Sequence, residues 1–358
     1  MKKKFKYLDY IDTIKRFRGI KNTRLNKIRL DANERVSDFN IKFVNSLKKK
    51  INSKYLSAYP EIEQIYDLLK KNYGFKSSNY FVTAGSDSGI RHCFELFAKK
   101  RGEIICLSPT FGMYEIYSKI FQANVKTITY DDNLNLDYKK LIQSINKKTL
   151  FVIFANPNSP TGTIIEKKDV LSIIKKAKKY NCYVIIDEAY YGFYRDTFAK
   201  YINKFPNLII LRTFSKAYGL AGIRAGYIIS NNKLIERFYK LRPMYEINSL
   251  AVLIIKEILR NKNEYNKYIK ETNNGKNYLI QELKKINLNF YTTYANFILV
   301  EFKDKYTQEK IYNNLFKKKI LTRYPPNIPA CRNYLRFTLG PKKYMRILIA
   351  EIKKILKK

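Results

Sequence analysis

Short apolar segments alternate with stretches of helical periodicity through the middle of the chain. The segments are nearly continuous in Val, Ile, Leu and Phe, as in TLFVIFANP (149–157) and LIILRTF (208–214). Such runs are typical of strands in a parallel sheet with helices on both faces. We therefore expect strands over 79–85, 103–109, 125–130, 149–157, 182–190, 208–214 and 225–230, and helices over 88–100, 114–123 and 169–180.

From Leu234 onward the pattern changes to long charged helical stretches followed by isolated strands. This order is typical of a separate α+β domain. The fold class is then α/β, with a large three-layer domain around a mostly parallel sheet and a smaller α+β domain. We expect an N-terminal arm over 1–30, a large domain over 31–245 and a small domain over 246–358. The arm should pack on the small domain or on a partner subunit. The second half should contain helices over 233–242, 249–285, 307–319 and 343–357, and strands over 289–302 and 334–339.

The composition supports a folded enzyme-sized protein. The chain has 358 residues, of which 46% are hydrophobic, and this is ample for a large core. No apolar run approaches the roughly 18 residues of a membrane-spanning helix, so we expect no membrane span. The start of the chain, MKKKFKYLDYIDTIK, lacks the apolar core and the cleavage site of a signal peptide.

The net charge of +40 raises the question of a nucleic-acid partner. A basic binding surface requires localised charge, whereas the lysines here are spread through the chain and fall mostly on the polar faces of the expected helices. Lys, Asn, Ile and Tyr are all abundant and all have AT-rich codons, so genome composition accounts for the excess. We expect no nucleic-acid partner.

Cysteine and histidine narrow the possible chemistry. Cys93, Cys106, Cys182 and Cys331 are scattered, which fits incidental thiols in a reducing cytoplasm. His92 is the single histidine, which argues against a Ser-His-Asp triad and against a histidine-rich metal site. Catalysis must then use Lys, Arg, Asp, Tyr or a cofactor, and we expect no metal.

One polar residue lies at the end of an expected buried strand and another just after one, at the edge where parallel sheets bind ligands. Lys216 lies in RTFSKAYGLAGIRAGY (212–227), eight residues before Arg224. Desolvation and a nearby cation would lower its pKa and make its amine able to form a Schiff base. Asp187, in VIIDEAY, needs a cationic or hydrogen-bonding partner there, such as a protonated pyridine nitrogen. Taken alone, Lys216 would be a solvated surface lysine and Asp187 a helix cap.

Three further segments have weaker signals of their own. VTAGSDSGI (82–90) would place the N–H groups of 85–87 and the Ser86 hydroxyl around a phosphate, although Ser and Asp also cap many helices. NPNSPTG (156–162) is a turn whose asparagine side chains can donate to a ligand oxygen. SPTFGMY (108–114) brings Phe111 to a strand end, where it can stack on a flat ring or simply pack in the core.

Together these segments resemble the fold type I pyridoxal-phosphate enzymes, and specifically the class I/II aminotransferases. Histidinol-phosphate aminotransferases are the nearest match, and the likeness spans roughly residues 30 to 340. DEAY followed by SKAYGLAGIRAGY is its most specific element. The resemblance implies pyridoxal 5′-phosphate as the cofactor. It implies that Lys216 binds the cofactor as a Schiff base and moves the substrate proton, that Asp187 holds the pyridine nitrogen, that Tyr190 bonds the phenolic oxygen and that Phe111 stacks on the ring.

The same resemblance implies where the cofactor phosphate and the substrate would bind. It implies that Tyr59, in AYPE, reaches the cofactor phosphate of a neighbouring subunit, which makes the active unit a homodimer. Asn296, in ANFILV, is read as structural, with a ligand-facing position as the alternative. The implied phosphate residues are Gly85, Ser86, Asp87, Ser215 and Arg224, and the implied substrate residues are Arg336 in NYLRFTLG, Arg323 in ILTRYPP and Asn33 in LDANE.

Two segments depart from the family pattern. Ser159 precedes Pro160 where the family often has Asn-Pro-Thr-Gly. Asn158 is therefore assigned the role of donating a hydrogen bond to the cofactor oxygen. LDANER lacks the Asn-Pro that often follows this Asn-Glu, which predicts a different cover over the substrate.

Three functions are weighed. The first is transamination from a donor such as glutamate to a small anionic oxo substrate. Arg323 and Arg336 favour a phosphate monoester such as imidazole-acetol phosphate or dihydroxyacetone phosphate. The second is decarboxylation of a phospho-amino acid on the same fold. The third is a non-catalytic nucleic-acid-binding relative, which the intact Lys216, Asp187 and Arg224 disfavour.

Overall fold

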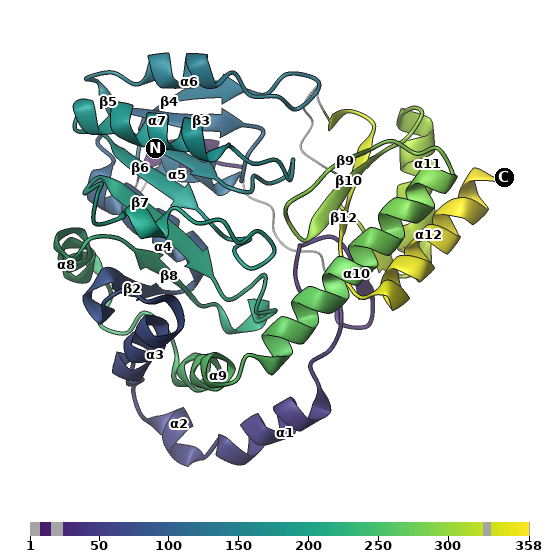
Figure 1. Ribbon diagram of the computed structural model, residues 1–358, viewed down its shortest axis with the longest axis horizontal. Helices are drawn as coiled ribbons and strands as arrows, with labels where there is room; N and C mark the ends of the chain where they lie inside the picture. Colours follow the sequence, from purple (N-terminus) through teal and green to yellow (C-terminus); the bar gives the residue numbers. More distant parts are fainter. Residues whose placement is uncertain (1–7, 16–23, 325–330, 358) are drawn as a thin grey trace, which may run out of the picture.

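A seven-stranded sheet forms the centre of the larger domain (Figure 1). The structure is a computed structural model that describes residues 8–15, 24–324 and 331–357. Within the sheet the strand order is β2-β8-β7-β6-β5-β3-β4, and only β8 runs antiparallel to its neighbours. The strands are β2 (Tyr80–Thr83), β3 (Glu103–Ser108), β4 (Asn124–Thr129), β5 (Thr149–Ala155), β6 (Tyr183–Asp187), β7 (Leu208–Thr213) and β8 (Gly226–Ile229).

Helices cover both faces of this sheet, which makes three layers. On one face α4, α5 and α8 pack against side chains such as Ile185 and Ile209. On the other, α3, α6, α7 and α9 pack against Val184 and Ile186. Adjacent residues of β6 thus enter different cores, which explains the unbroken apolar run. The helices are α3 (Glu63–Tyr73), α4 (Gly85–Phe97), α5 (Met113–Ile120), α6 (Tyr138–Ser144), α7 (Lys167–Lys179), α8 (Asn232–Leu241) and α9 (Ser249–Arg260).

The second domain has its own core. Its antiparallel sheet has the order β12-β10-β9, and a two-stranded parallel pair joins β1 to β11. Leu30 and Val36 are buried in this core, so the end of the expected arm and the residues just after it pack on the second domain. Its elements are β1 (Ile28–Arg29), α10 (Asn263–Lys285), β9 (Phe290–Tyr291), β10 (Phe297–Glu301), α11 (Lys305–Lys317), β11 (Ile320–Leu321), β12 (Tyr334–Thr338) and α12 (Lys342–Leu356).

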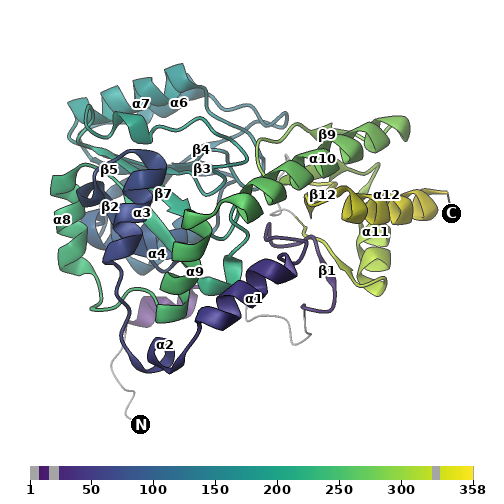
Figure 2. The same ribbon diagram turned by 60° about the horizontal axis from the view of Figure 1, so that its bottom comes forward.

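Helix α10 connects the two cores (Figures 1 and 2). Tyr265 and Ile269 near its start belong to the core of the large domain, whereas Leu279 and Leu283 belong to that of the second domain. The buried face of α9, from Ala251 to Leu259, also packs on the large domain, although the expected boundary lay near residue 245. We propose that the division between the domains falls within α10.

The remaining elements lie at the periphery. Figure 2 shows α1 (Ile41–Lys50) and α2 (Ser53–Ser57) extending away from the main sheet, and none of their residues is buried. In the described part of the arm, Tyr10 donates a hydrogen bond to the Ile120 carbonyl at 3.0 Å. No helix in the described ranges is both long and apolar enough to cross a membrane. The short 3₁₀ turns are η1 (Asp9–Thr13), η2 (Ser77–Asn79), η3 (Ala199–Tyr201) and η4 (Ala221–Ile223).

Candidate active site

A cavity of about 680 Å³ lies between the carboxyl ends of the large-sheet strands and the second domain. Asp187 ends β6 and Thr213 ends β7, and both line it. Parallel sheets bind ligands at this edge. The predicted site residues that line the cavity are Asn33, Ser86, Asp87, Phe111, Asp187, Tyr190, Ser215, Lys216, Arg224, Arg323 and Arg336.

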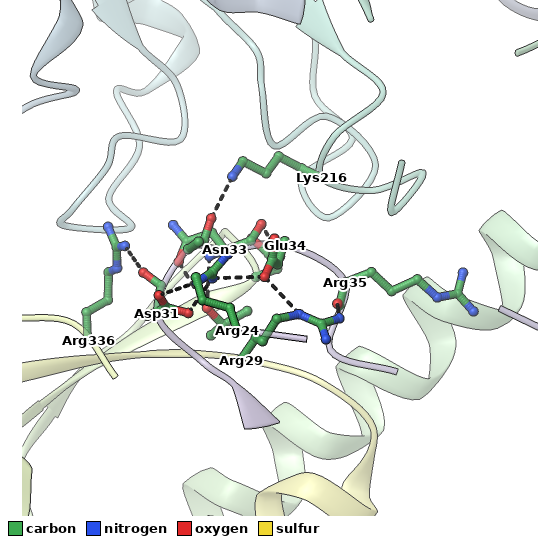
Figure 3. Close-up of polar contacts among 11 residues, drawn as sticks. Arg24, Arg29, Asp31, Asn33, Glu34, Arg35, Lys216 and Arg336 are labelled. Carbon is green, nitrogen blue, oxygen red and sulfur yellow. Dashed lines mark hydrogen bonds and ion pairs between the residues drawn. The ribbon is translucent and has the colours of Figure 1, made fainter. Parts of the chain in front are cut away.

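The side chain of Lys216 crosses the cavity toward the N-terminal segment. Its Nζ donates a hydrogen bond to the carbonyl of Ala32 at 3.0 Å (Figure 3). Burial lowers the pKa of Lys216 to about 8, and the cationic Arg336 and Arg224 act in the same direction. Near neutral pH a useful fraction of this amine is therefore unprotonated and nucleophilic.

Asp187 is almost fully buried, with 3% of its surface exposed. Its Oδ2 accepts a hydrogen bond from the Tyr114 hydroxyl at 3.1 Å, and its Oδ1 accepts one from the Ala189 N–H at 3.0 Å. Burial raises the pKa of Asp187 to about 6, although these two hydrogen bonds oppose the rise. Because both donors are neutral, the carboxylate still lacks a directly bonded cation. A protonated pyridine nitrogen would supply that cation, so Asp187 fits pyridoxal phosphate.

Tyr190 connects Asp187's strand to the N-terminal segment. Its hydroxyl accepts a hydrogen bond from Asn33 Nδ2 at 3.0 Å, and its ring packs edge-on against Phe297. Burial raises the pKa of Tyr190, whereas the Arg336 charge opposes the rise. The hydroxyl stays protonated and can still donate its hydrogen to an anionic ligand oxygen.

The start of α4 and the loop after β7 form a cradle suited to an anion. Gly85 has a φ of +86°, and a Cβ there would come within 2.9 Å of Arg224 Nη2, so the guanidinium lies directly against this turn. Arg224 Nη1 donates to Ser215 Oγ at 3.2 Å. Ser86 and Asp87 line the cavity on the first turn of α4, where the helix dipole favours negative charge. The cradle therefore fits the phosphate of the cofactor.

The opposite wall consists of segment 31–34 and residues of the second domain (Figure 3). Arg336 Nη2 donates to the Asp31 carbonyl at 2.8 Å, while its buried Nε has no partner in the described part of the chain. Arg323 pairs with Arg336 through backbone hydrogen bonds and also lines the cavity. Two neighbouring guanidinium groups, one with an unused buried donor, suit a phosphate or carboxylate.

Arginines outside the cavity neutralise the carboxylates of this wall. Arg24 Nη2 lies 2.7 Å from Asp31 Oδ1 and 2.9 Å from Glu34 Oε1. Arg29 Nε lies 2.9 Å from the same Glu34 oxygen. These contacts hold the two acidic side chains, so Arg323 and Arg336 stay available for a ligand.

Three predicted residues are not among those that line the cavity. Asn158 is buried but does not line the cavity: it donates to the Pro109 carbonyl and Thr161 Oγ1, and it accepts from Thr110 Oγ1. Gly85 contributes only its backbone, against Arg224. Tyr59 is 73% exposed and stacks on Tyr245 at 4.0 Å, outside the cavity. The roles predicted for these residues remain predictions.

Sequence reasoning missed several contributors. Tyr114 lies one helical turn after Phe111 and holds Asp187, but a tyrosine at that spacing is indistinguishable from a core residue. Ser159 and Pro160 line the cavity beside the Asn158 that was chosen instead. The carbonyl of Ala32 could not have been found, because a backbone group has no signature in the sequence.

A large mostly parallel sheet with a part-buried lysine and a buried aspartate at its carboxyl edge defines a fold type I pyridoxal-phosphate enzyme. The chain belongs to the class I and II aminotransferases, whose family model matches residues 26–352. It is thus a pyridoxal-phosphate-dependent aminotransferase, as the motifs predicted.

Curated and solved relatives agree with this family. The chain is 35% identical to a histidinol-phosphate aminotransferase of Clostridium novyi (strain NT), over 88% of each chain. It is 34% identical to that of Thermoanaerobacter pseudethanolicus (strain ATCC 33223 / 39E), over 95% of this chain and 97% of the relative. The fold matches a histidinol-phosphate aminotransferase of Sinorhizobium meliloti in complex with pyridoxal-5′-phosphate. That match has a TM-score of 0.83 and 21% identity, and it covers 92% of this chain and 91% of the other.

Proposed function

We propose that this aminotransferase moves an amino group from a donor such as glutamate to a small phosphorylated oxo compound, as a histidinol-phosphate aminotransferase does. The carrying observation is the wall of Arg323 and Arg336 facing the part-buried Lys216 across one cavity. The names of the relatives support a phosphate-bearing substrate. Imidazole-acetol phosphate is the first candidate acceptor, and dihydroxyacetone phosphate is the second.

The residues around the cavity divide the work. When bound, pyridoxal phosphate supplies an aldehyde for the amino group and a ring that withdraws electrons from the reacting carbon. With the cofactor bound, Asp187 would keep the ring nitrogen protonated, and Tyr190 would donate to the ring oxygen. The turn at 85–87 and Arg224 would hold the phosphate. Lys216, whose pKa is lowered to about 8 chiefly by burial, can take the Cα proton and return it on the same face of the site.

The wall formed by Arg323 and Arg336 would orient the substrate. A phosphate bound there places the far end of a short substrate toward Lys216, because these residues line opposite sides of the same cavity. Bidentate contacts to a guanidinium fix direction as well as position. The cover formed by segment 31–34 would then exclude water from the amine.

The test follows the half-reaction with glutamate by absorbance and then the acceptor phase with each phosphorylated ketone. We expect glutamate to convert the aldehyde form to the amine form, and imidazole-acetol phosphate to convert it back. Lys216→Ala should lower turnover by about four orders of magnitude. Release of CO₂ from a phospho-amino acid without transamination would contradict the proposal and favour the decarboxylase.

We also propose that the active unit is a homodimer. Leu56, Tyr59 and Met244 are at least 73% exposed, and they lie where segment 55–59 meets segment 244–249. Ser249 Oγ donates to the Ala58 carbonyl at 2.9 Å and joins these segments. Exposed apolar side chains grouped in this way favour burial against a second copy.

We propose a cytoplasmic location as well. It is supported by the four cysteines, which are all free and buried, as expected in a reducing compartment.

Mixed dimers can test the homodimer and the role of Tyr59 together. Lys216→Ala and Tyr59→Phe subunits are combined, and the mass is measured by light scattering. We expect a dimer. If Tyr59 serves the neighbouring site, the mixed dimer has one site with both defects and one intact site. Activity should therefore exceed the average of the two parent variants. A monomer, or a mixture no more active than that average, would contradict this proposal.

A further inference from the structure

A carboxylate from a distant part of the chain anchors the anion cradle at the start of α4. Glu246 lies between α8 and α9, and its side chain is only 4% exposed. Its Oε1 accepts hydrogen bonds from the Ala84 N–H at 3.1 Å and from the Ser88 hydroxyl. These two donors flank Ser86 and Asp87, which line the cavity. Glu246 therefore fixes the turn from both of its ends.

The same carboxylate contacts the one histidine of the chain. His92 Nε2 lies 3.3 Å from both oxygens of Glu246, and Nδ1 lies 3.0 Å from Glu95 Oε2. A neutral imidazole has only one N–H and would direct a lone pair at one of these carboxylates. The doubly protonated ring satisfies both. Although burial opposes it, the hydrogen bond and charge of Glu246 raise the pKa of His92, and Glu95 adds to this rise.

The charged surroundings of His92 are few. On its own helix, Arg91 binds the other oxygen of Glu95 at 2.9 Å. Strand β2 contributes the uncharged ring of Phe81, packed edge-on at 5.5 Å. Helix α8 contributes Tyr239, which packs on Phe81 and stays neutral because burial raises its pKa. Glu246 is thus the carboxylate whose charge His92 balances, since Arg91 already serves Glu95.

We propose that Glu246 and His92 are a positioning pair for the cofactor phosphate: Glu246 holds the turn at 84–88, and protonated His92 cancels the charge that Glu246 places beside a bound anion. This rests on the proposed role of that turn in binding the phosphate. A carboxylate at an anion site repels the ligand unless a cation neutralises it. When His92 loses its proton, Glu246 becomes an unbalanced charge, and the phosphate should bind less tightly. Cofactor retention should therefore fall as the pH rises through the pKa of His92.

Release of pyridoxamine 5′-phosphate, which forms no covalent bond to Lys216, tests this pair. The holoenzyme is loaded with this compound and moved into cofactor-free buffer, and the release rate is measured from about pH 6 to about pH 9. We expect the wild type to release it about fivefold faster at the high end. Glu246→Gln keeps the two hydrogen-bond acceptor contacts without the charge, so its release should be slow and nearly independent of this titration.

The remaining variants distinguish an effect of the charge balance between His92 and Glu246 from a general loss of structure around α4. His92→Gln should release the cofactor fast at every pH, and the double variant His92→Gln with Glu246→Gln should behave like Glu246→Gln alone. Lys99→Gln, an exposed charge change just after the same helix, should match the wild type. The proposal is overturned if Glu246→Gln keeps the wild-type pH step, or if His92→Gln retains the cofactor as well as the wild type does at low pH.

A measurement without any variant provides a second test. Since His92 is the one histidine in the chain, its ring signals can be titrated directly by NMR. By linkage, a fivefold coupling requires the bound cofactor to raise the pKa of His92 by about 0.7. An unchanged pKa would overturn the proposal. Neither measurement includes an oxo substrate, so an error in the substrate assignment would leave both results unaffected.

Discussion

The two walls of the cavity are built in different ways. On the cofactor side, Asp187 and Thr213 end adjacent parallel strands, and Ser215 and Lys216 follow within three residues. On the substrate side, Asn33 bonds Thr338, and Arg336 bonds the carbonyl of Asp31, across 305 positions of sequence. The first wall is positioned by a sheet that forms anyway. The second exists only when the N-terminal segment packs on the other domain.

Charge is also distributed differently. The cofactor side concentrates its charge in a few groups, such as Asp187, Lys216 and Arg224. The substrate side carries Asp31, Glu34, Arg323 and Arg336, and further arginines outside the cavity neutralise its acids. We therefore expect single substitutions in the substrate wall to weaken substrate binding and raise KM. Single substitutions in the cofactor wall should instead lower kcat.

Among the variants that compare the two walls, Asp187→Asn should have the largest effect on activity. The amide keeps the size and can still accept the Tyr114 hydrogen bond, but it has no charge for the ring nitrogen. We expect kcat to fall by about a thousandfold. Tyr114→Phe is the graded partner: it removes one hydrogen bond, raises the pKa of Asp187 further, and should reduce kcat by about tenfold. Full activity of Asp187→Asn would remove this residue from the site.

Arg336→Gln should affect the opposite wall through binding. Loss of a charge-assisted contact predicts a rise of about a hundredfold in KM for the phosphorylated acceptor, with a smaller change in kcat. Arg332→Gln is the matched control, because Arg332 is exposed on the same segment. Steady-state kinetics with both variants distinguishes the two walls. A loss confined to kcat would contradict the assignment of Arg336 to substrate binding.

Arg35 anchors the substrate wall to α10, and Arg35→Gln should loosen it. Arg35 Nη2 lies 3.1 Å from Glu264 Oε2, and the guanidinium stacks 4.0 Å from the ring of Phe39. Removing Arg35 leaves Glu264 as a buried unpaired charge, which predicts a loss of about 3 kcal/mol in unfolding free energy. Urea denaturation measures this loss, and adding Glu264→Gln should recover part of it. Equal stability of the single variant and the wild type would show that the pair does not anchor the segment.

The smallest predicted effect links the walls. In the cofactor-free protein, reaction of Lys216 with pyridoxal phosphate needs the unprotonated amine. The rate should rise with pH and level off above about 8, because burial and the nearby cations lower the pKa of Lys216 to about 8. Arg336→Gln removes one of those cations, so the midpoint should move upward toward the ordinary value of 10.5. Stopped-flow absorbance at several pH values gives the midpoint, and a downward move would contradict the cause assigned here.

The sequence predicted the first wall better than the second. Each expected strand of the large sheet is present, and Asp187 and Lys216 lie at strand ends as expected, because local apolar runs and the turns after them determine these positions. The link from Arg35 to Glu264 spans 229 positions and could not be predicted from either residue. Arg35 is the last residue of LDANER, the segment that departs from the family pattern. Its side chain is directed away from the cavity (Figure 3).

Local sequence also misjudged some element boundaries. The expected helix over 249–285 is two helices, because the chain turns at Asn261 and Lys262 between α9 and α10. The expected strand over 289–302 is divided into β9 and β10, and the pair β1 with β11 was not expected. Two-residue strands have no periodicity to detect, so only the packing of distant segments reveals them.

Helix α10 couples the positions of the two domains mechanically, because it is packed into both cores. Its 23 residues span about 35 Å, one end is seated in each core, and a Cβ on Gly275 would come within 1.8 Å of the Gly340 carbonyl. The helix therefore crosses the start of α12 with no room to slide sideways at that point, which acts as a pivot. A tilt of roughly 5° about that point would displace each end by about 1.5 Å, enough to make or break a hydrogen bond. A small rotation of the second domain would therefore change the width of the cavity, because Arg323 and Arg336 of that domain line one side of it.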